Sequence, residues 1–251
     1  MPLHGFPGSV LWNKFDCPVP QVNTGNSHSH NVNYVWNTHG YRTHEFDQLA
    51  DEYMLTAGCS LTEGIGLHAQ DRWSNLLEQQ IGIQTINLGK GAANAEFVKH
   101  VITSWVHNQP IKPKFVIAQW PSTFRISKYA NDSLAFLVNH HDDPVFEAIL
   151  KHSSMTFLDN WITAVIETNR WLQLCNIPCY NIMYYKQEFI DDTNKICTLL
   201  ERQNITAHWD TVIDNKSTWE LGADLALDNM HPGPKCNQQW SEHIINIINQ
   251  S

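Results

Sequence analysis

The sequence predicts an α/β protein whose parallel sheet is covered by helices on both faces. From residue 53 onward, short apolar runs alternate with amphipathic helical patterns. Each segment between two runs is long enough for the crossover helix that parallel strands need. A chain of 251 residues with 42% apolar composition can bury a core of this size in one domain. We therefore predict an irregular extension over residues 1–50 and one α/β domain over residues 51–251.

Each predicted element has its own local signal. Strands are expected at 53–57, 85–88, 114–120 and 177–185, where apolar and β-branched residues cluster. The segment 71–82 predicts a helix that Asp71 caps and Gly82 ends. Apolar faces predict three further helices, around 97–105, 157–174 and 240–248. Tryptophan lies on the apolar faces of all four helices, as Trp73, Trp105, Trp161 and Trp240.

The extension shows neither helical nor strand periodicity. Residues 21–46 are rich in Asn, His and Thr. Four aromatic residues interrupt this polar composition: Tyr34, Trp36, Tyr41 and Phe46. Aromatic side chains of this size favour an arm that packs on the domain over a freely disordered tail.

Composition excludes several classes of partner. The formal charge of −9 arises from 16 basic and 25 acidic residues, and no run of Lys or Arg offers a surface for nucleic acid. No window holds about 18 consecutive apolar residues, and the N-terminus lacks the pattern of a signal peptide, so we expect a cytoplasmic protein without membrane contact. Six scattered cysteines without a C-x-x-C pair predict reduced thiols. The oligomeric state is left open.

Candidate catalytic residues lie at the carboxyl ends of the predicted strands, where such sheets bind ligands. "AGCSLT" follows the first strand and contains Ser60, and "LALDNMHPGP" before the last helix contains Asp228 and His231. Because these two residues are three positions apart on a turn, the carboxylate can accept the Nδ1 proton and leave Nε2 free as a base. Taken alone, Ser60 is best interpreted as a turn or helix-cap residue. Taken alone, Asp228 and His231 are best interpreted as a surface pair. The order and placement of all three residues together favour a Ser-His-Asp catalytic triad.

Several short blocks, taken in order, carry a family resemblance. "GCSLTEGIGL", "RWSNLLE", "NLGKGAAN" and "DNMHPGP" resemble the blocks of the SGNH/GDSL hydrolases, and "WNTHGYRTHEF" is similar to a segment that precedes the first block in extended members. The resemblance implies a flavodoxin-like three-layer α/β/α sandwich and an esterase without cofactor. It assigns Ser60 as nucleophile, His231 as general base and Asp228 as its orienting partner. It places the N–H groups of Ser60 and Gly91 in the oxyanion hole, with Gly89 as second choice.

Two positions depart from the family pattern. Cys59 replaces the Asp before the serine, and "QWPSTFR" after the third strand lacks the Asn that donates to the oxyanion. Loss of one such donor typically lowers the rate about 100- to 1000-fold. Candidates to replace it are Gln119, Ser122 and Thr123, and Arg125 could hold a substrate carboxylate. Trp120 reads equally well as a wall of the substrate pocket or as a core residue.

The resulting hypothesis is a serine esterase that cleaves a small acyl ester, such as an acetyl group on a carbohydrate. Acyl transfer by the same triad and a non-catalytic binding module are the alternatives. Thr62 stands where an α/β-hydrolase elbow needs Gly, which excludes that class.

Two competing interpretations have less support: Cys59 as the nucleophile, and metal binding by histidines. We therefore predict no metal site. The histidines in question are His28, His30, His39 and His44, together with the 140–143 cluster.

Overall fold

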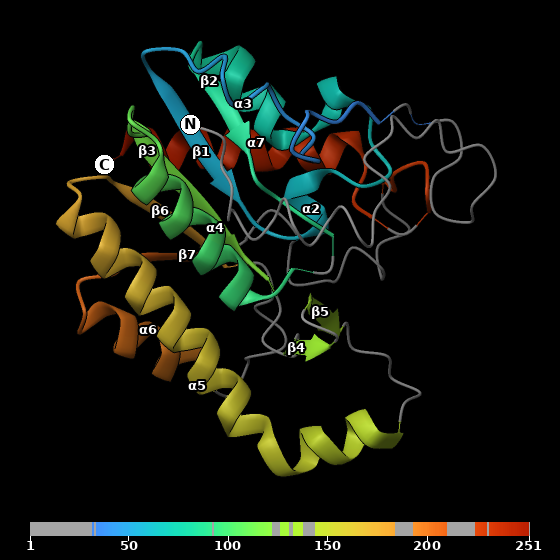
Figure 1. Ribbon diagram of the computed structural model, residues 1–251, viewed down its shortest axis with the longest axis vertical. Helices are drawn as coiled ribbons and strands as arrows, with labels where there is room; N and C mark the ends of the chain where they lie inside the picture. The colour runs from blue at the N-terminus through green and yellow to red at the C-terminus, as the bar shows by residue number, and fades with distance from the viewer. Residues whose placement is uncertain are drawn as a thin grey trace.

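A five-stranded parallel sheet forms the centre of the computed structural model (Figure 1). The structure describes residues 32, 34–91, 93–121, 126–130, 133–137, 144–183, 193–209, 224–229 and 231–250. The sheet order is β2-β1-β3-β6-β7, which is the flavodoxin-like arrangement. Its strands are β1 Tyr53–Ala57, β2 Gln84–Asn87, β3 Phe115–Trp120, β6 Cys179–Met183 and β7 Ala207–Trp209. The predicted parallel sheet is confirmed.

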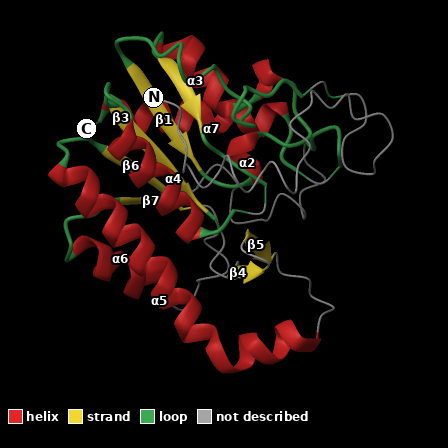
Figure 2. Ribbon diagram, in the orientation of Figure 1, coloured by secondary structure: helices red, strands yellow, loops and turns green. Residues whose placement is uncertain are grey.

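Helices cover both faces of this sheet (Figure 2). Helices α4, Ala95–Asn108, and α5, Pro144–Leu174, pack together in front of the sheet in the view of Figure 1. Behind it, α7, Pro234–Asn249, packs against α3, Trp73–Ile81. The three-layer α/β/α architecture is therefore confirmed. The remaining described elements are α2 Ser60–Glu63, the 3-10 helix Ala69–Asp71, α6 Thr193–Glu201 and the hairpin of β4 Ile126–Ala130 and β5 Ser133–Leu137.

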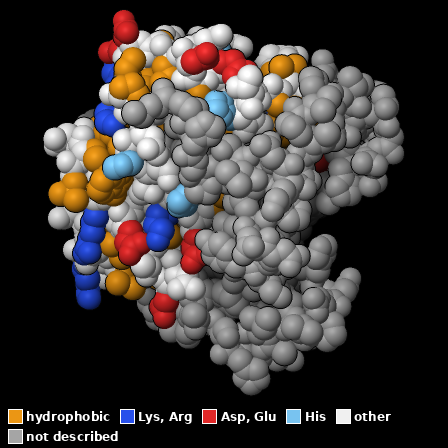
Figure 3. Space-filling model, in the orientation of Figure 1, with side chains coloured by type: hydrophobic (Ala, Val, Ile, Leu, Met, Phe, Trp, Pro, Cys, Tyr) orange, Lys and Arg blue, Asp and Glu red, His pale blue; other side chains and the backbone are white. Residues whose placement is uncertain are grey.

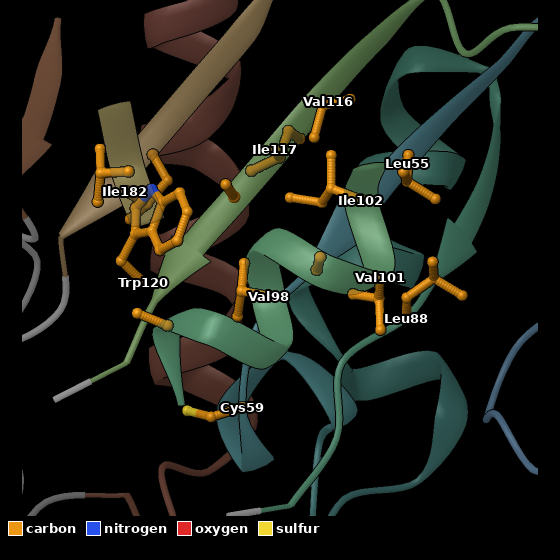
Figure 4. Packing of buried hydrophobic residues seen from close by; sticks show 14 of the residues in the cluster. Leu55, Cys59, Leu88, Val98, Val101, Ile102, Val116, Ile117, Trp120 and Ile182 are labelled. Carbon is orange, nitrogen blue, oxygen red and sulfur yellow. The ribbon is translucent and has the colours of Figure 1, made fainter. Parts of the chain in front are cut away.

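The core lies between the sheet and its helices. Every residue of β1 and of β3 is buried, as expected for central strands covered on both faces. Figure 4 shows side chains of α4, among them Val98, Val101 and Ile102, packed with residues of the strands. All four tryptophans predicted on apolar helix faces are buried: Trp73, Trp105, Trp161 and Trp240.

The predicted helix boundaries need two corrections. Asp71 does not cap α3, because it ends the preceding 3-10 turn and Arg72 stands at the N-cap. The Trp73 N–H instead donates to Asn237 Oδ1 of α7 at 3.1 Å, a tertiary contact that no local pattern reveals. Gly82 does end the helix, with φ 72°. Helix α5 begins at Pro144, well before the predicted start at 157.

Residues 34–50 form turns and irregular backbone, without helix or strand. Tyr34, Tyr41 and Phe46 are buried in this segment, and the Phe46 ring meets Trp105 edge-on at 4.6 Å between ring centroids. These three aromatic side chains of the arm are buried in the structure. Residues 1–31 lie outside the described part, so the extent of the extension stays a prediction.

In the described part of the face shown in Figure 3, Lys and Arg side chains occur at several separate places, some of them beside acidic side chains. Lys99, for example, pairs with Glu167 at 2.7 Å, and Lys114 pairs with Glu52 at 3.1 Å. Among the described helices, none has both the length and the apolar character that a membrane crossing requires.

Candidate active site

Ser60 is the first residue of α2, directly after the turn that ends β1. Cys59 precedes it in extended backbone and makes no side-chain capping bond. A Cβ at Gly58 would lie 2.0 Å from Thr62 Oγ1, so glycine is needed for this tight strand-to-helix turn. Ser60 thus starts a helix at the carboxyl end of β1, between β2 and β3, where ligands bind in open α/β sheets.

Asp228 and His231 form a hydrogen-bonded pair in the loop before α7. His231 Nδ1 lies 2.5 Å from Asp228 Oδ2, and the His231 backbone N–H donates to Oδ1 at 3.0 Å. The Asp228 side chain is fully buried, whereas 23% of the His231 side chain is exposed. An ionised carboxylate only accepts, so it holds the proton on Nδ1 and leaves Nε2 as the free lone pair. The sequence-predicted pairing is present in the structure.

Gly66 joins this loop to the exit of the Ser60 helix. The Leu227 N–H donates to the Gly66 carbonyl at 3.0 Å. Gly66 has φ 79°, and a Cβ on it would lie 2.8 Å from Asp228 Cγ. No hydrogen bond joins Ser60 to His231 among the described residues; the two segments meet through Gly66.

The glycine turn after β2 uses its backbone donors within the protein. The Gly89 N–H donates to Asn87 Oδ1 at 2.8 Å, and the Gly91 N–H donates to the Glu63 carboxylate. A Cβ at Gly89 would lie 2.5 Å from the Glu63 nitrogen, so this turn packs directly on α2. Either glycine amide would have to leave its present acceptor before it could bind an oxyanion. The choice between Gly89 and Gly91 stays a prediction.

A buried ion pair, which the sequence did not reveal, lies beside this turn. Lys90 Nζ is 3.4 Å from Glu63 Oε1, and both side chains are at most 4% exposed. Lys90 also donates to the Gly40 carbonyl at 2.9 Å and lies 4.1 Å from the centroid of the Trp36 ring. Buried lysines are rare unless they are paired, so the arm and α2 together complete the environment of this side chain.

Arg42 of the arm binds the carboxyl end of α2. Its guanidinium donates to the carbonyls of Glu63, Gly64 and Leu67, at 3.2, 2.5 and 2.9 Å. A cation there complements the partial negative charge of helix carbonyls. Burial lowers the pKa of Arg42 to about 10, although the charge of Glu63 opposes this shift. Arg42 stays protonated at neutral pH and fixes the arm to the helix that carries Ser60.

The third block divides into core residues and residues outside the described part. Gln119 is buried, and its Oε1 accepts from Thr62 Oγ1 at 2.5 Å. Trp120 is fully buried, donates from Nε1 to Asn181 Oδ1 at 3.0 Å and packs edge-on against Trp161. These contacts identify Trp120 as a core residue and not as a wall of the substrate pocket. Ser122, Thr123 and Arg125 lie outside the described residues.

The competing candidates have structural roles where they are described. Cys59 is buried in the apolar cluster, at 1% exposure. His39 stacks on Phe46, and His44 Nε2 bonds with the Glu78 carboxylate at 2.9 Å. Four cysteines whose side chains are described form no disulfide: Cys59, Cys175, Cys179 and Cys236. His28, His30 and the 140–143 cluster fall outside the described residues.

Comparison with solved structures places this geometry among known folds. A carbohydrate esterase, whose active site is described as having divergent catalytic and non-catalytic binding functions, matches 80% of this chain and 65% of its own, with a TM-score of 0.51 and 10% identity. A lipolytic protein of the G-D-S-L family from Veillonella parvula DSM 2008 matches 80% of this chain and 100% of its own, with a TM-score of 0.46 and 11% identity. This chain shares the three-layer α/β/α fold of the carbohydrate esterase. In this fold, Ser60 follows the first strand and the Asp228–His231 loop precedes the last helix.

A third structure of similar fold is an acetyl xylan esterase from Butyrivibrio proteoclasticus, at 13% identity and a TM-score of 0.47, over 82% of this chain and 65% of its own. No protein-family model matches the sequence, and no curated protein matches it either.

Proposed function

We propose that the protein is a serine esterase that cleaves small acyl esters through an acyl-enzyme on Ser60. The observation that carries this proposal is the Asp228–His231 pair, with 2.5 Å between Nδ1 and Oδ2 and its loop bonded to the exit of the Ser60 helix. A buried carboxylate that fixes the imidazole tautomer is what a general base for a serine hydroxyl needs.

The proposed reaction has two halves. His231 Nε2 takes the Ser60 proton as Oγ attacks the ester carbonyl, and the imidazolium then protonates the leaving alcohol. In the second half, His231 takes a proton from water, the hydroxide attacks the acyl-enzyme, and Ser60 recovers its proton as the acid leaves. Asp228 stabilises the imidazolium in both halves without itself being protonated.

Oxyanion stabilisation is proposed to come first from the Ser60 N–H, which makes no hydrogen bond with a described residue. Gln119 is the second proposed donor, because Thr62 holds its Oε1 and thereby fixes the orientation of its amide nitrogen. Gly91 or Gly89 could contribute once its N–H leaves the acceptor that it has in this structure.

The substrate class we propose is an acyl ester on a carbohydrate, with acetyl as the acyl group. This step is an analogy of fold, because a carbohydrate esterase shares the architecture. Acyl transfer to a sugar hydroxyl would use the same residues, with an alcohol in place of water.

A non-catalytic binding module is the second candidate. The observation in its favour is that the N–H groups of Gly89 and Gly91 both donate to protein oxygens. A site that binds an ester or sugar without turnover would not need these donors free.

Turnover of a short-chain p-nitrophenyl ester tests the two candidates against each other. We expect the wild-type protein to hydrolyse it and Ser60→Ala to lose activity by at least about 1000-fold, since the nucleophile is gone. Ser104→Ala is the matched control, because Ser104 lies on α4 and its hydroxyl bonds with His100 at an exposed position. Equal turnover by wild type and Ser60→Ala, or none by either, would overturn the esterase proposal.

A further inference from the structure

The Gly66 residue is hydrogen-bonded on two sides, to the arm and to the catalytic loop. Its N–H donates to the Tyr34 hydroxyl oxygen at 2.7 Å, and its carbonyl accepts from the Leu227 N–H at 3.0 Å. Tyr34 belongs to the arm, and Leu227 immediately precedes Asp228. A single residue therefore links the arm to the loop that orients the general base.

The same glycine packs directly on the carboxyl group of Asp228. A Cβ at Gly66 would lie 2.8 Å from Asp228 Cγ and also 2.8 Å from Asp228 Oδ1. Asp228 Oδ1 is the oxygen that accepts from the His231 N–H. Because interiors are close-packed, a displaced Gly66 backbone must displace this carboxyl group or open a gap beside it.

Tyr34 is itself held in place on the exit of α2. Its side chain is buried, the Arg42 guanidinium carbon lies 4.1 Å above its ring, and the Trp36 ring stacks beside it at 6.0 Å between centroids. Arg42 in turn donates to the Gly64 carbonyl, two residues before Gly66. The hydroxyl of Tyr34 is thus a fixed acceptor for one particular N–H.

We propose that Tyr34 is a positioning residue for the Asp228–His231 pair and acts through Gly66. Its side chain contacts Gly66, Arg42 and Trp36, none of which has a proposed role in the chemical step. Its hydroxyl fixes the Gly66 peptide, and Gly66 fixes Asp228 by packing and fixes the neighbouring Leu227 by a hydrogen bond. The effect on turnover rests on the proposed function, whereas the effect on the Asp228–His231 geometry does not.

Tyr34→Phe tests this role, because it removes only the hydroxyl. We expect kcat for the short-chain ester to fall about 10-fold with KM within about twofold of wild type, since a small misplacement of a catalytic base slows chemistry more than binding. Proton NMR supplies the second readout: the downfield resonance of the His231 Nδ1–H, assigned by its loss in His231→Gln, should shift or broaden.

Tyr53→Phe is the matched control. The Tyr53 hydroxyl accepts from Trp105 Nε1 at 3.0 Å and donates to the Ile111 carbonyl at 2.8 Å, away from the loop of Asp228. This variant should lower the melting temperature yet leave kcat and the His231 resonance unchanged. Gly66→Ala should disturb the same resonance from the other side of the link, which keeps the test decisive if Tyr34→Phe folds poorly.

An unchanged His231 resonance in both Tyr34→Phe and Gly66→Ala would overturn the proposal. A similar change of the resonance in Tyr53→Phe would also overturn it, because the effect would then be general destabilisation. If wild type shows no turnover but the resonance changes in Tyr34→Phe and not in Tyr53→Phe, the esterase proposal fails and the positioning role stands.

Discussion

The two halves of the candidate active site use their hydrogen bonds in opposite ways. In the half that contains Asp228 and His231, the bonds orient a functional group and leave His231 Nε2 free to act. In the half that contains the glycine turn, the N–H groups of Gly89 and Gly91 already donate to the side chains of Asn87 and Glu63. The proposed general base is therefore preorganised, whereas the proposed oxyanion side depends on the Ser60 N–H, on a side chain such as Gln119, or on a rearrangement of the turn.

The largest expected effect is on the preorganised half. Asp228→Asn keeps the shape of the side chain but presents an amide that no longer selects the Nδ1–H tautomer. We expect kcat for the short-chain ester to fall by about 1,000- to 10,000-fold. Steady-state kinetics measures this loss.

Asp224→Asn is the control for that variant, because Asp224 lies in the same loop and accepts from the Lys235 and Cys236 N–H groups at the start of α7. It should lower stability while kcat stays within a few-fold of wild type. Similar kcat losses in the two variants would mean that Asp228 only holds the loop together.

The next effect concerns the buried pair that supports the glycine turn. Glu63→Gln leaves the charge of Lys90 buried without its partner, which should lower the free energy of unfolding by about 3–5 kcal/mol. Urea denaturation measures this change. The double variant Glu63→Gln/Lys90→Met should recover much of the loss, since neither charge is then left buried.

The exposed pair of Glu52 and Lys114 is the matched comparison for that measurement. Glu52→Gln should change the free energy of unfolding by less than about 1 kcal/mol. A Glu63→Gln effect of the same small size would contradict a structural role for the buried pair.

A third, smaller effect tests the oxyanion side itself. Gln119→Glu retains an oxygen that accepts from Thr62 but removes the amide donor, so we expect kcat to fall about 100-fold. Thr62→Val removes only the bond that orients Gln119 and should cost less activity. If Gln119→Glu retains wild-type kcat, Gln119 is not the missing donor.

The smallest effect is a pH dependence of the arm's attachment. The hydrogen bond with Glu78 raises the pKa of His44. Burial acts to raise the pKa of Glu78, but hydrogen bonds from His44 and from the Thr85 N–H lower it overall. Because the pKa of His44 is raised in the folded state, protonated His44 stabilises the fold at acidic pH. This stabilisation is lost as the pH rises through the folded-state pKa of His44. Because the pKa of Glu78 is lowered in the folded state, ionised Glu78 stabilises the fold at higher pH. This stabilisation is lost as the pH falls through the folded-state pKa of Glu78.

The pair should therefore stabilise most between the unfolded-state pKa values of Glu and His, about 4.3 and 6.5. His44→Gln should lower the melting temperature more at pH 6 than at pH 8. Because the pair is partly exposed, the difference should be small. An equal loss at both pH values would argue that the charge on His44 contributes nothing.

The sequence predicted those parts of the fold that depend on local periodicity. The buried face of α4, with Phe97, Val101 and Trp105 among its residues, follows directly from its apolar spacing. The three-residue strand β7 and the hairpin β4–β5 escaped prediction. In α6, Ile196 and Leu200 are buried one helical turn apart, a signal that a search of short segments would have found.

The site was predictable where chemistry and order along the chain coincide, and not where it depends on tertiary contacts. Asp228 and His231 lie three residues apart, so their pairing could be inferred from spacing alone. The environment of Lys90 combines Gly40, Trp36 and Glu63, and the link from Tyr34 to Gly66 spans 32 residues. Such contacts exist only in the folded chain, and no local pattern encodes them.

Covalent labelling by a fluorophosphonate tests the central claim most directly. Mass spectrometry of the labelled wild-type protein should find one adduct, on Ser60, and labelling should slow by orders of magnitude in His231→Ala and disappear in Ser60→Ala. Labelling of Ser60 at the same rate with and without His231, or no adduct on Ser60 at all, would contradict an activated serine at this site.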